Sequence, residues 1–259
     1  MHSSTPSELV DFAEAPGLFM SSAPGLAVRH SPRFALTAEH GSTYCAVEAI
    51  RLHEDDVEAA IAEVDAFMAE TATRVASWWL TDRSTPDDVE ERLLGAGLEL
   101  VENDYLHAAM LLTTPPPTVD GLEAREVASF EEFAEARRLQ RAVFADPNGH
   151  DRTDEELAAE YELALSPMFA AWIDGRVAAA GRAVFTPVGV YLMGGSTAPW
   201  ARGRGAYRAV VRARWDAAVA HGTPALGVGA GSMSRPILER LGFAQVGRFR
   251  RLQSVRSDT

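Results

Sequence analysis

Three consecutive prolines, Pro115 to Pro117, are the feature of this sequence that most limits its fold. Each proline lacks an amide hydrogen and has a fixed φ, so a run of three continues neither a helix nor a strand. Helix-like and strand-like patterns lie on both sides of this run. We therefore expect two domains in the 259-residue chain, one over 1–115 and one over 119–259.

The part after the prolines has a clear order of apolar patterns. The order predicted is β-α-α-β-β-β-α-β-α-β, over 122–127, 130–144, 154–165, 168–173, 176–185, 190–197, 206–220, 225–231, 234–243 and 244–255. Ser129 with Glu132, and Thr153 with Glu156, have the spacing of capping boxes at the starts of the two consecutive helices. Asp174-Gly175 is a favoured two-residue hairpin turn.

The part before the prolines is patterned less clearly. The first thirty residues are rich in Ser, Pro and Gly, and we expect them to be weakly ordered or to form an arm. Strands are predicted at 41–52, 76–80 and 105–113, with helices at 57–68 and 84–100, the second capped by Thr85. Segment 89–112 resembles segment 236–255 in its order of helix, glycine corner and strand, which suggests an internal repeat.

Composition excludes several classes of function. The chain contains no lysine, so a Walker-type phosphate loop, a pyridoxal enzyme and a protein kinase are excluded. The net charge of −13 argues against nucleic acid and membrane surfaces as partners. The seven histidines are scattered, so we predict no metal. A single cysteine and the absence of an apolar run near 20 residues or a signal-like start favour a cytoplasmic protein.

The stretch Pro199–Val211, PWARGRGAYRAVV, is the most informative part of the sequence for function. A strand pattern precedes it and a helical stripe follows it, so Gly203 and Gly205 stand at a helix N-terminus. There the first amides have no intrahelical partner and the helix dipole is positive. Arg202 and Arg204 can add charge-assisted hydrogen bonds, so the stretch is suited to a pyrophosphate. A glycine turn with solvated arginines is the alternative.

The dinucleotide fingerprint fits this stretch poorly, because Arg208 stands where its third glycine belongs. The stretch and its context instead resemble the GNAT acyltransferase superfamily. The family's phosphate loop reads R/Q-x-x-G-x-G/A, which Arg202 and Gly205 match, although Tyr207 replaces the final small residue. Its later motif L-Y-E-K-L-G-F is similar to Ile237–Phe243, except that Leu238 replaces the tyrosine.

The resemblance implies an α/β (α+β) fold with a mixed, mostly antiparallel sheet flanked by helices, in two similar halves. It also implies that acetyl-CoA or another acyl-CoA lies where strands 190–197 and 225–231 diverge. The residues it places at the cofactor are Ser196, Thr197, Arg202, Gly203, Arg204, Gly205, Ala206, Tyr207 and Ser234. The first half would then be a degenerate GNAT-like domain, with the second half catalytic.

The catalytic residues are harder to assign, because the family tyrosine that often protonates the leaving thiolate falls at Leu238. Either Tyr191, Ser232, Ser234 or a water donates the proton in its place, or the thiolate leaves unprotonated. His150 is a candidate base or a surface histidine, and Trp200 a candidate wall of the acceptor pocket.

The function implied is N-acyl transfer to the amine of a small molecule by direct attack in a ternary complex, in a monomer or homodimer. A non-catalytic CoA-binding or sensory module is the first alternative, motivated by the missing tyrosine. Aminoacyl transfer or acyl transfer to a protein N-terminus is the second alternative.

Overall fold

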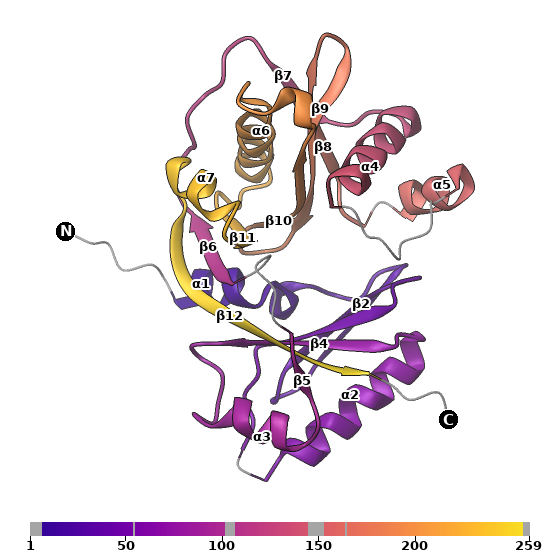
Figure 1. Cartoon of the computed structure of the whole chain (residues 1–259), viewed down its shortest axis with the longest axis vertical. Coiled ribbons are helices and arrows are strands. Elements are labelled where there is room, and N and C mark those ends of the chain that lie inside the picture. Colours follow the sequence, from indigo (N-terminus) through magenta and orange to yellow (C-terminus); the bar gives the residue numbers. More distant parts are fainter. Residues whose placement is uncertain (1–6, 54, 102–106, 145–152, 164, 256–259) are drawn as a thin grey trace, which may run out of the picture. The chain divides into compact units, whose positions relative to one another are not determined.

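The computed structural model describes residues 7–53, 55–101, 107–144, 153–163 and 165–255 (Figure 1). The chain divides into two compact units. Unit 1 draws on residues 1–111, 229–237 and 244–259, and unit 2 on 112–228 and 238–243. Neither unit is one continuous segment, because 229–237 and 244–259 belong to unit 1 while 238–243 belongs to unit 2. The division of the sequence into a degenerate GNAT-like domain over 1–115 and a catalytic domain over 119–259 stays a prediction.

Unit 1 is a mixed sheet with helices. Its helices are α1 (Ser7–Glu14), η1 (Pro16–Phe19), α2 (Val57–Thr71) and α3 (Val89–Gly95), and its strands are β1 (Leu26–His30), β2 (Ala35–Glu39), β3 (Tyr44–Glu48), β4 (Val75–Thr81), β5 (Glu99–Leu100), β6 (Ala108–Leu112) and β12 (Ala244–Val255). Strands β3 and β4 are parallel, whereas β12 runs antiparallel to β4, β5 and β6. Within unit 1, Figure 1 shows α2 and α3 on one side of this sheet.

Two expectations for the first half are wrong. Residues 7–30 form α1, η1 and β1 instead of a weakly ordered arm, because Phe12 and Ala13 are fully buried and anchor the segment. Thr85 does not cap α3: it forms a bridge with Arg51, and the helix begins only at Val89. Tertiary pairing there overrides the local capping pattern.

Unit 2 is a sheet with a helix layer on each side. It contains β7 (Glu123–Glu126), α4 (Phe130–Phe144), α5 (Asp154–Leu163), β8 (Met168–Ile173), β9 (Arg176–Phe185), β10 (Val190–Thr197), η2 (Pro199–Ala201), α6 (Ala206–Ala220), most of β11 (Leu226–Ala230) and the end of α7 (Arg235–Arg240). The order of elements predicted from the sequence is confirmed. Strands β7 to β10 pair antiparallel in sequence order, and β11 runs parallel to β10.

The helices α4 and α6 lie on opposite sides of the strands of unit 2 (Figure 1). On the α4 side, Phe133 and Ala136 of the helix pack with apolar residues of β8 and β9 such as Met168 and Ala180. Many of the sheet residues are alanine, so both helices approach the backbone of the strands closely. The fold is therefore the mixed, mostly antiparallel sheet with flanking helices that the sequence predicts.

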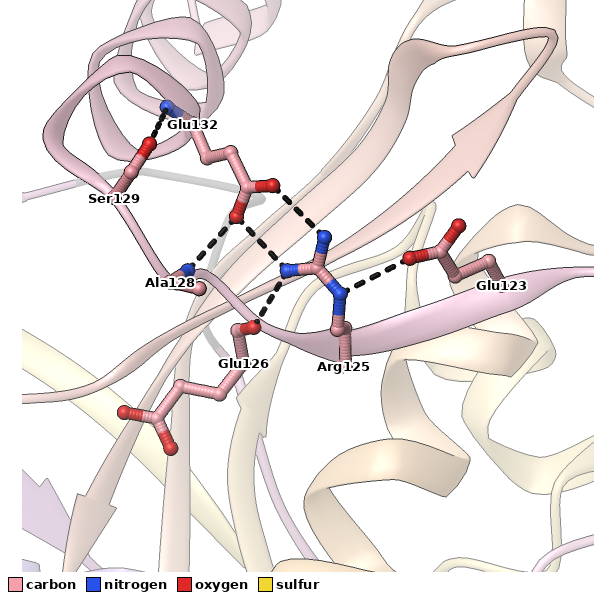
Figure 2. A network of polar contacts seen from close by, with 6 residues as sticks. All are labelled: Glu123, Arg125, Glu126, Ala128, Ser129 and Glu132. Atoms are coloured by element: carbon pink, nitrogen blue, oxygen red, sulfur yellow. Dashed lines mark hydrogen bonds and ion pairs between the residues drawn. The ribbon is translucent and has the colours of Figure 1, made fainter.

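Capping interactions fix the start of α4 (Figure 2). The Glu132 amide donates to the Ser129 hydroxyl at 3.3 Å, while the Glu132 carboxylate accepts from the Ala128 amide at 2.8 Å. Arg125 of β7 binds both oxygens of that carboxylate at 2.8 Å, and this ion pair lowers the pKa of Glu132 to about 2. The predicted capping box is confirmed, with its return bond displaced by one residue.

The second predicted capping box, at the start of α5, is confirmed with both of its hydrogen bonds. The Thr153 amide donates to the Glu156 carboxylate at 2.8 Å, and the Glu156 amide donates to the Thr153 hydroxyl at 3.2 Å. The Asp174-Gly175 turn is also confirmed, because both residues have the positive φ of a tight hairpin turn, 54° and 72°.

The helix and glycine corner shared by segments 89–112 and 236–255 have the same backbone geometry. Gly97 and Gly242 have φ of 96° and 98°. The amide after each glycine returns to a leucine carbonyl at 3.1 Å, Leu98 to Leu93 and Phe243 to Leu238. Both helices therefore end in the same way, with a glycine in the left-handed conformation.

Within the described residues, no helix combines the length and the low polarity needed to cross a bilayer.

Candidate anion loop and strand bulge

The loop before α6 turns at two glycines with positive φ, and the first turn of the helix provides free amides. Gly203 and Gly205 have φ of 76° and 87°, a region that glycine adopts without penalty. The first i→i−4 hydrogen bond of the helix joins the amide of Ala209 to the Gly205 carbonyl, at 3.0 Å. The amides of the helical residues before it, Ala206 to Arg208, therefore have no intrahelical partner, and they suit an anion.

Two arginines of this loop are exposed to solvent. Arg202 makes no ion pair with any residue of the described part of the chain, and the Arg204 guanidinium lies 4.0 Å from the Asp174 carboxylate in the turn between β8 and β9. Beside the loop, the Arg176 guanidinium covers the ring of Trp200 at 4.6 Å from its centroid. These side chains form a local cationic surface in a chain whose overall charge is negative.

Strands β10 and β11 pair only at their starts. Val190 pairs with Leu226 and Tyr191 with Gly227, and within the described part of the sheet no further pair joins the two strands. On its other side β10 stays paired with β9, where Ser196 faces Ala180 and Thr197 faces Ala179. The backbone edge of β10 beyond Tyr191 is therefore available, which fits a ligand that lies along a strand edge.

A bulge interrupts β10 between Met193 and Ser196. Two consecutive glycines, Gly194 and Gly195, form it, and a helix contacts each of them. The Gln140 amide of α4 donates to the Gly194 carbonyl at 2.6 Å. A Cβ added to Gly195 would lie 2.8 Å from the Tyr207 ring of α6. Both glycines remain exposed to solvent, but a Cβ on either would lie within 3 Å of one of these two side chains, so only glycine fits there.

Tyr207 stands where the family pattern has a small residue, and its side chain packs between the strand bulge and a buried arginine. Its ring packs against Gly195 on one side and lies next to Arg214, which is 0% exposed, on the other. The Arg214 guanidinium donates to the Val210 and Arg182 carbonyls at 3.3 and 3.1 Å. Burial lowers the pKa of Arg214 and raises that of Tyr207, and the proximity of the two groups opposes both shifts.

The predicted catalytic residues fall in different places. Tyr191 lies at the last β10–β11 pair, where the strands begin to diverge. The exposed Ser232 and the partly buried Ser234 belong to unit 1, and the Ser234 hydroxyl accepts from the Gly231 amide at 3.1 Å. Leu238 is fully buried. His150 lies outside the described residues.

The hydroxyl of Ser196 is buried and donates to the Ala180 carbonyl at 3.4 Å, so only the backbone of this residue can serve a cofactor. The described residues include no group of three or more His, Cys, Asp or Glu that could hold a metal.

The sequence patterns did not predict the role of Gln140 or the bulge in β10. The pair Gly194-Gly195 inside a strand was the available signal, because an interior glycine often marks a bulge.

The arrangement of elements in this chain is that of the GNAT fold. A GCN5-related N-acetyltransferase from Kribbella flavida has a similar structure, with 14% identity and a TM-score of 0.66 over 98% of each chain. A tandem GNAT protein from the clavulanic acid biosynthesis pathway has 13% identity and a TM-score of 0.60, over 96% of this chain and 88% of that one.

A GNAT-family protein from Novosphingobium aromaticivorans has 16% identity and a TM-score of 0.54, over 96% of this chain and 97% of that one. No family model and no curated protein sequence matches the chain. At these identities the likeness shows the fold alone. The resemblance to the GNAT fold is thereby confirmed, and it extends to a tandem protein over nearly the whole chain.

Proposed function

We propose that this protein is an acyl-CoA-dependent N-acyltransferase that moves an acyl group, most simply acetyl, to the amine of a small molecule. The observation that carries the proposal is the combination of the free amides in the first turn of α6, the open edge of β10 and the bulge at Gly194-Gly195. The amides suit the pyrophosphate, and the strand edge suits the amide groups of the pantetheine arm.

The reaction needs little from the protein beyond orientation and an oxyanion donor. The neutral amine attacks the thioester carbon, the carbonyl oxygen takes up negative charge, and the C–S bond breaks with its electron pair leaving on sulfur. The amine proton is lost to a base or to water. A backbone amide directed at the oxygen stabilises the charged intermediate, and the amides of the bulge, where the β9–β10 register shifts, are the candidates.

Arg202→Glu tests the cofactor site. The side chain is exposed, so the change should leave stability unaltered while it places a carboxylate beside the pyrophosphate. We expect acetyl-CoA affinity, measured by calorimetry, to fall at least tenfold, with a weaker salt dependence than in wild type. Arg248→Glu, the same charge change at an exposed position of β12 in unit 1, is the matched control. Equal affinity in wild type and Arg202→Glu would remove the loop from the proposed site.

A CoA-binding module without catalysis is the second candidate, because Leu238 stands where the family has its tyrosine and is fully buried. A screen of amines with detection of free thiol separates the two functions. Thiol release that depends on one amine supports the transferase, and binding without release on any amine class supports the module. Peptides with free N-termini and aminoacyl donors belong in the same screen.

A further inference from the structure

A chain of buried and half-buried polar groups runs from α5 through α4 to the bulge of β10. The Glu160 carboxylate lies 3.0 Å from Arg137 Nε, and Arg137 Nη1 donates to the Gln140 side-chain oxygen at 2.8 Å. The other end of the Gln140 amide donates to the Gly194 carbonyl at 2.6 Å. Gln140 is only 3% exposed. Its amide is thus held at both ends, which also fixes which atom is oxygen and which is nitrogen.

Fixing the Gly194 carbonyl also fixes the amide that follows it. The peptide unit between Gly194 and Gly195 is planar and trans, so its N–H points opposite to its C=O. Gly194 has φ of 60°, a left-handed conformation that glycine adopts without a steric penalty. The direction of the Gly195 N–H is therefore set by the Gln140 hydrogen bond, and the Tyr207 ring limits movement of this peptide from the other side.

We propose that Gln140 is a positioning residue for acyl transfer: it directs the Gly194–Gly195 peptide so that the Gly195 amide donates to the acyl carbonyl of the cofactor. Arg137 and Glu160 hold Gln140 in the required orientation. This inference rests on the proposed function, since it assigns the acyl end of the same cofactor site. It links α5 to the acyl group through a single continuous set of hydrogen bonds and one ion pair.

The test uses the full chain with glycine-selective ¹⁵N labelling, because glycines report both ends of the site. In wild type, acetyl-CoA and CoA should both shift the Gly203 and Gly205 amides, which face the pyrophosphate. Acetyl-CoA should shift the Gly195 amide further than CoA does, since CoA lacks the acyl carbonyl. The quantity measured is this acetyl-specific shift at Gly195.

Gln140→Met keeps the size of the side chain and removes its donor. The acetyl-specific shift at Gly195 should fall by at least half, while the Gly203 and Gly205 shifts and the CoA affinity stay within twofold of wild type. Gln140→Glu, which cannot donate when ionised, should act in the same direction, and so should Arg137→Met. These two variants carry the test if Gln140→Met does not fold.

Arg138→Met is the matched control. Arg138 is the neighbour of Arg137 on α4 and also pairs with α5, through Asp154, but both side chains are exposed and neither contacts Gln140. In Arg138→Met, the acetyl-specific shift of the Gly195 amide should equal that of wild type.

The outcomes separate the two proposals. Unresponsive Gly203 and Gly205 amides in wild type overturn the cofactor site itself. A response there without an acetyl-specific shift at Gly195 overturns the bulge as the acyl site. An acetyl-specific shift that survives in Gln140→Met and Gln140→Glu overturns the positioning role. A loss confined to the Gln140 and Arg137 variants supports it.

Discussion

At the scale of single residues, Gly203 and Gly205 have similar backbones and different surroundings. Both have positive φ, which costs a residue with a Cβ about 1 kcal/mol. A Cβ on Gly203 would meet nothing within 4 Å, whereas one on Gly205 would lie 3.2 Å from the Val119 side chain. Substitution of Gly203 therefore measures the cost of positive φ alone, and substitution of Gly205 adds the cost of a steric contact.

We predict that Gly203→Ala lowers the free energy of unfolding by about 1 kcal/mol and that Gly205→Ala lowers it further, by about 2 kcal/mol in total. Urea denaturation of both variants beside wild type measures the difference. Equal destabilisation would mean that Val119 moves aside freely. For the same reason a substitution at Gly205 is a poorer probe of cofactor binding than Arg202→Glu.

At the scale of elements, η1 is attached to the sheet of unit 1 through the backbone of Gly17. The Gly17 amide donates to the Glu48 carboxylate at 2.7 Å, and His30 Nε2 contacts the Gly17 carbonyl at 2.8 Å. Burial raises the pKa of Glu48 to about 7, and the Gly17 hydrogen bond only partly opposes this. The attachment is therefore sensitive to pH in the neutral range.

The sign of this dependence follows from linkage. The folded state holds the Glu48 proton more tightly than the unfolded state, so its contribution to stability is lost as pH rises from about 4.5 to about 7. The loss is at most about 3 kcal/mol. We predict that Glu48→Gln, which still accepts from the Gly17 amide, matches wild type near pH 5 and is more stable than it at pH 8.

Urea denaturation at the two pH values measures this difference, with Glu58→Gln, an exposed carboxyl on α2, as the control. An advantage of Glu48→Gln that is the same at both pH values would contradict the assignment, because a group that does not titrate in this window gives no pH dependence.

At the scale of the whole molecule, the two compact units share the chain in an interleaved order. Strand β12, the last in the sequence, pairs with β4 over seven residues, from Phe249 with Thr81 to Val255 with Val75. Its Leu252 is fully buried in the core of unit 1. The first part of the chain therefore depends on the last part for a strand of its sheet.

We predict that deleting 244–259 prevents the first part of unit 1, residues 1–111, from folding, although the two segments lie far apart in sequence. Removing the strand exposes the edge of β4 and the core beneath Leu252. Limited proteolysis should then cut within 26–48 and 75–81, which hold strands of unit 1 that should resist in the intact protein. A protease-resistant unit 1 in the absence of 244–259 would contradict this dependence.

The local structure of the second half followed from the sequence because its signals are local. Ser129, Thr153 and Asp174-Gly175 act within a few residues of themselves, and they formed the caps and the turn predicted. The capping pattern at Thr85 failed because a segment distant in sequence pairs with this residue. Thr85 pairs with Arg51 instead of capping a helix, because bridge formation satisfies its backbone.

By itself, the sequence determined the order of elements, the glycine loop before α6 and the exclusion of lysine-based chemistry. Each depends on residue type and short spacing. Only the tertiary structure decided that Gln140 reaches the Gly194 carbonyl across 54 positions, that Tyr207 covers Gly195, and that β12 completes unit 1. These contacts join residues remote along the chain, and their partners are set by packing of the sheet and helices, which no local pattern encodes.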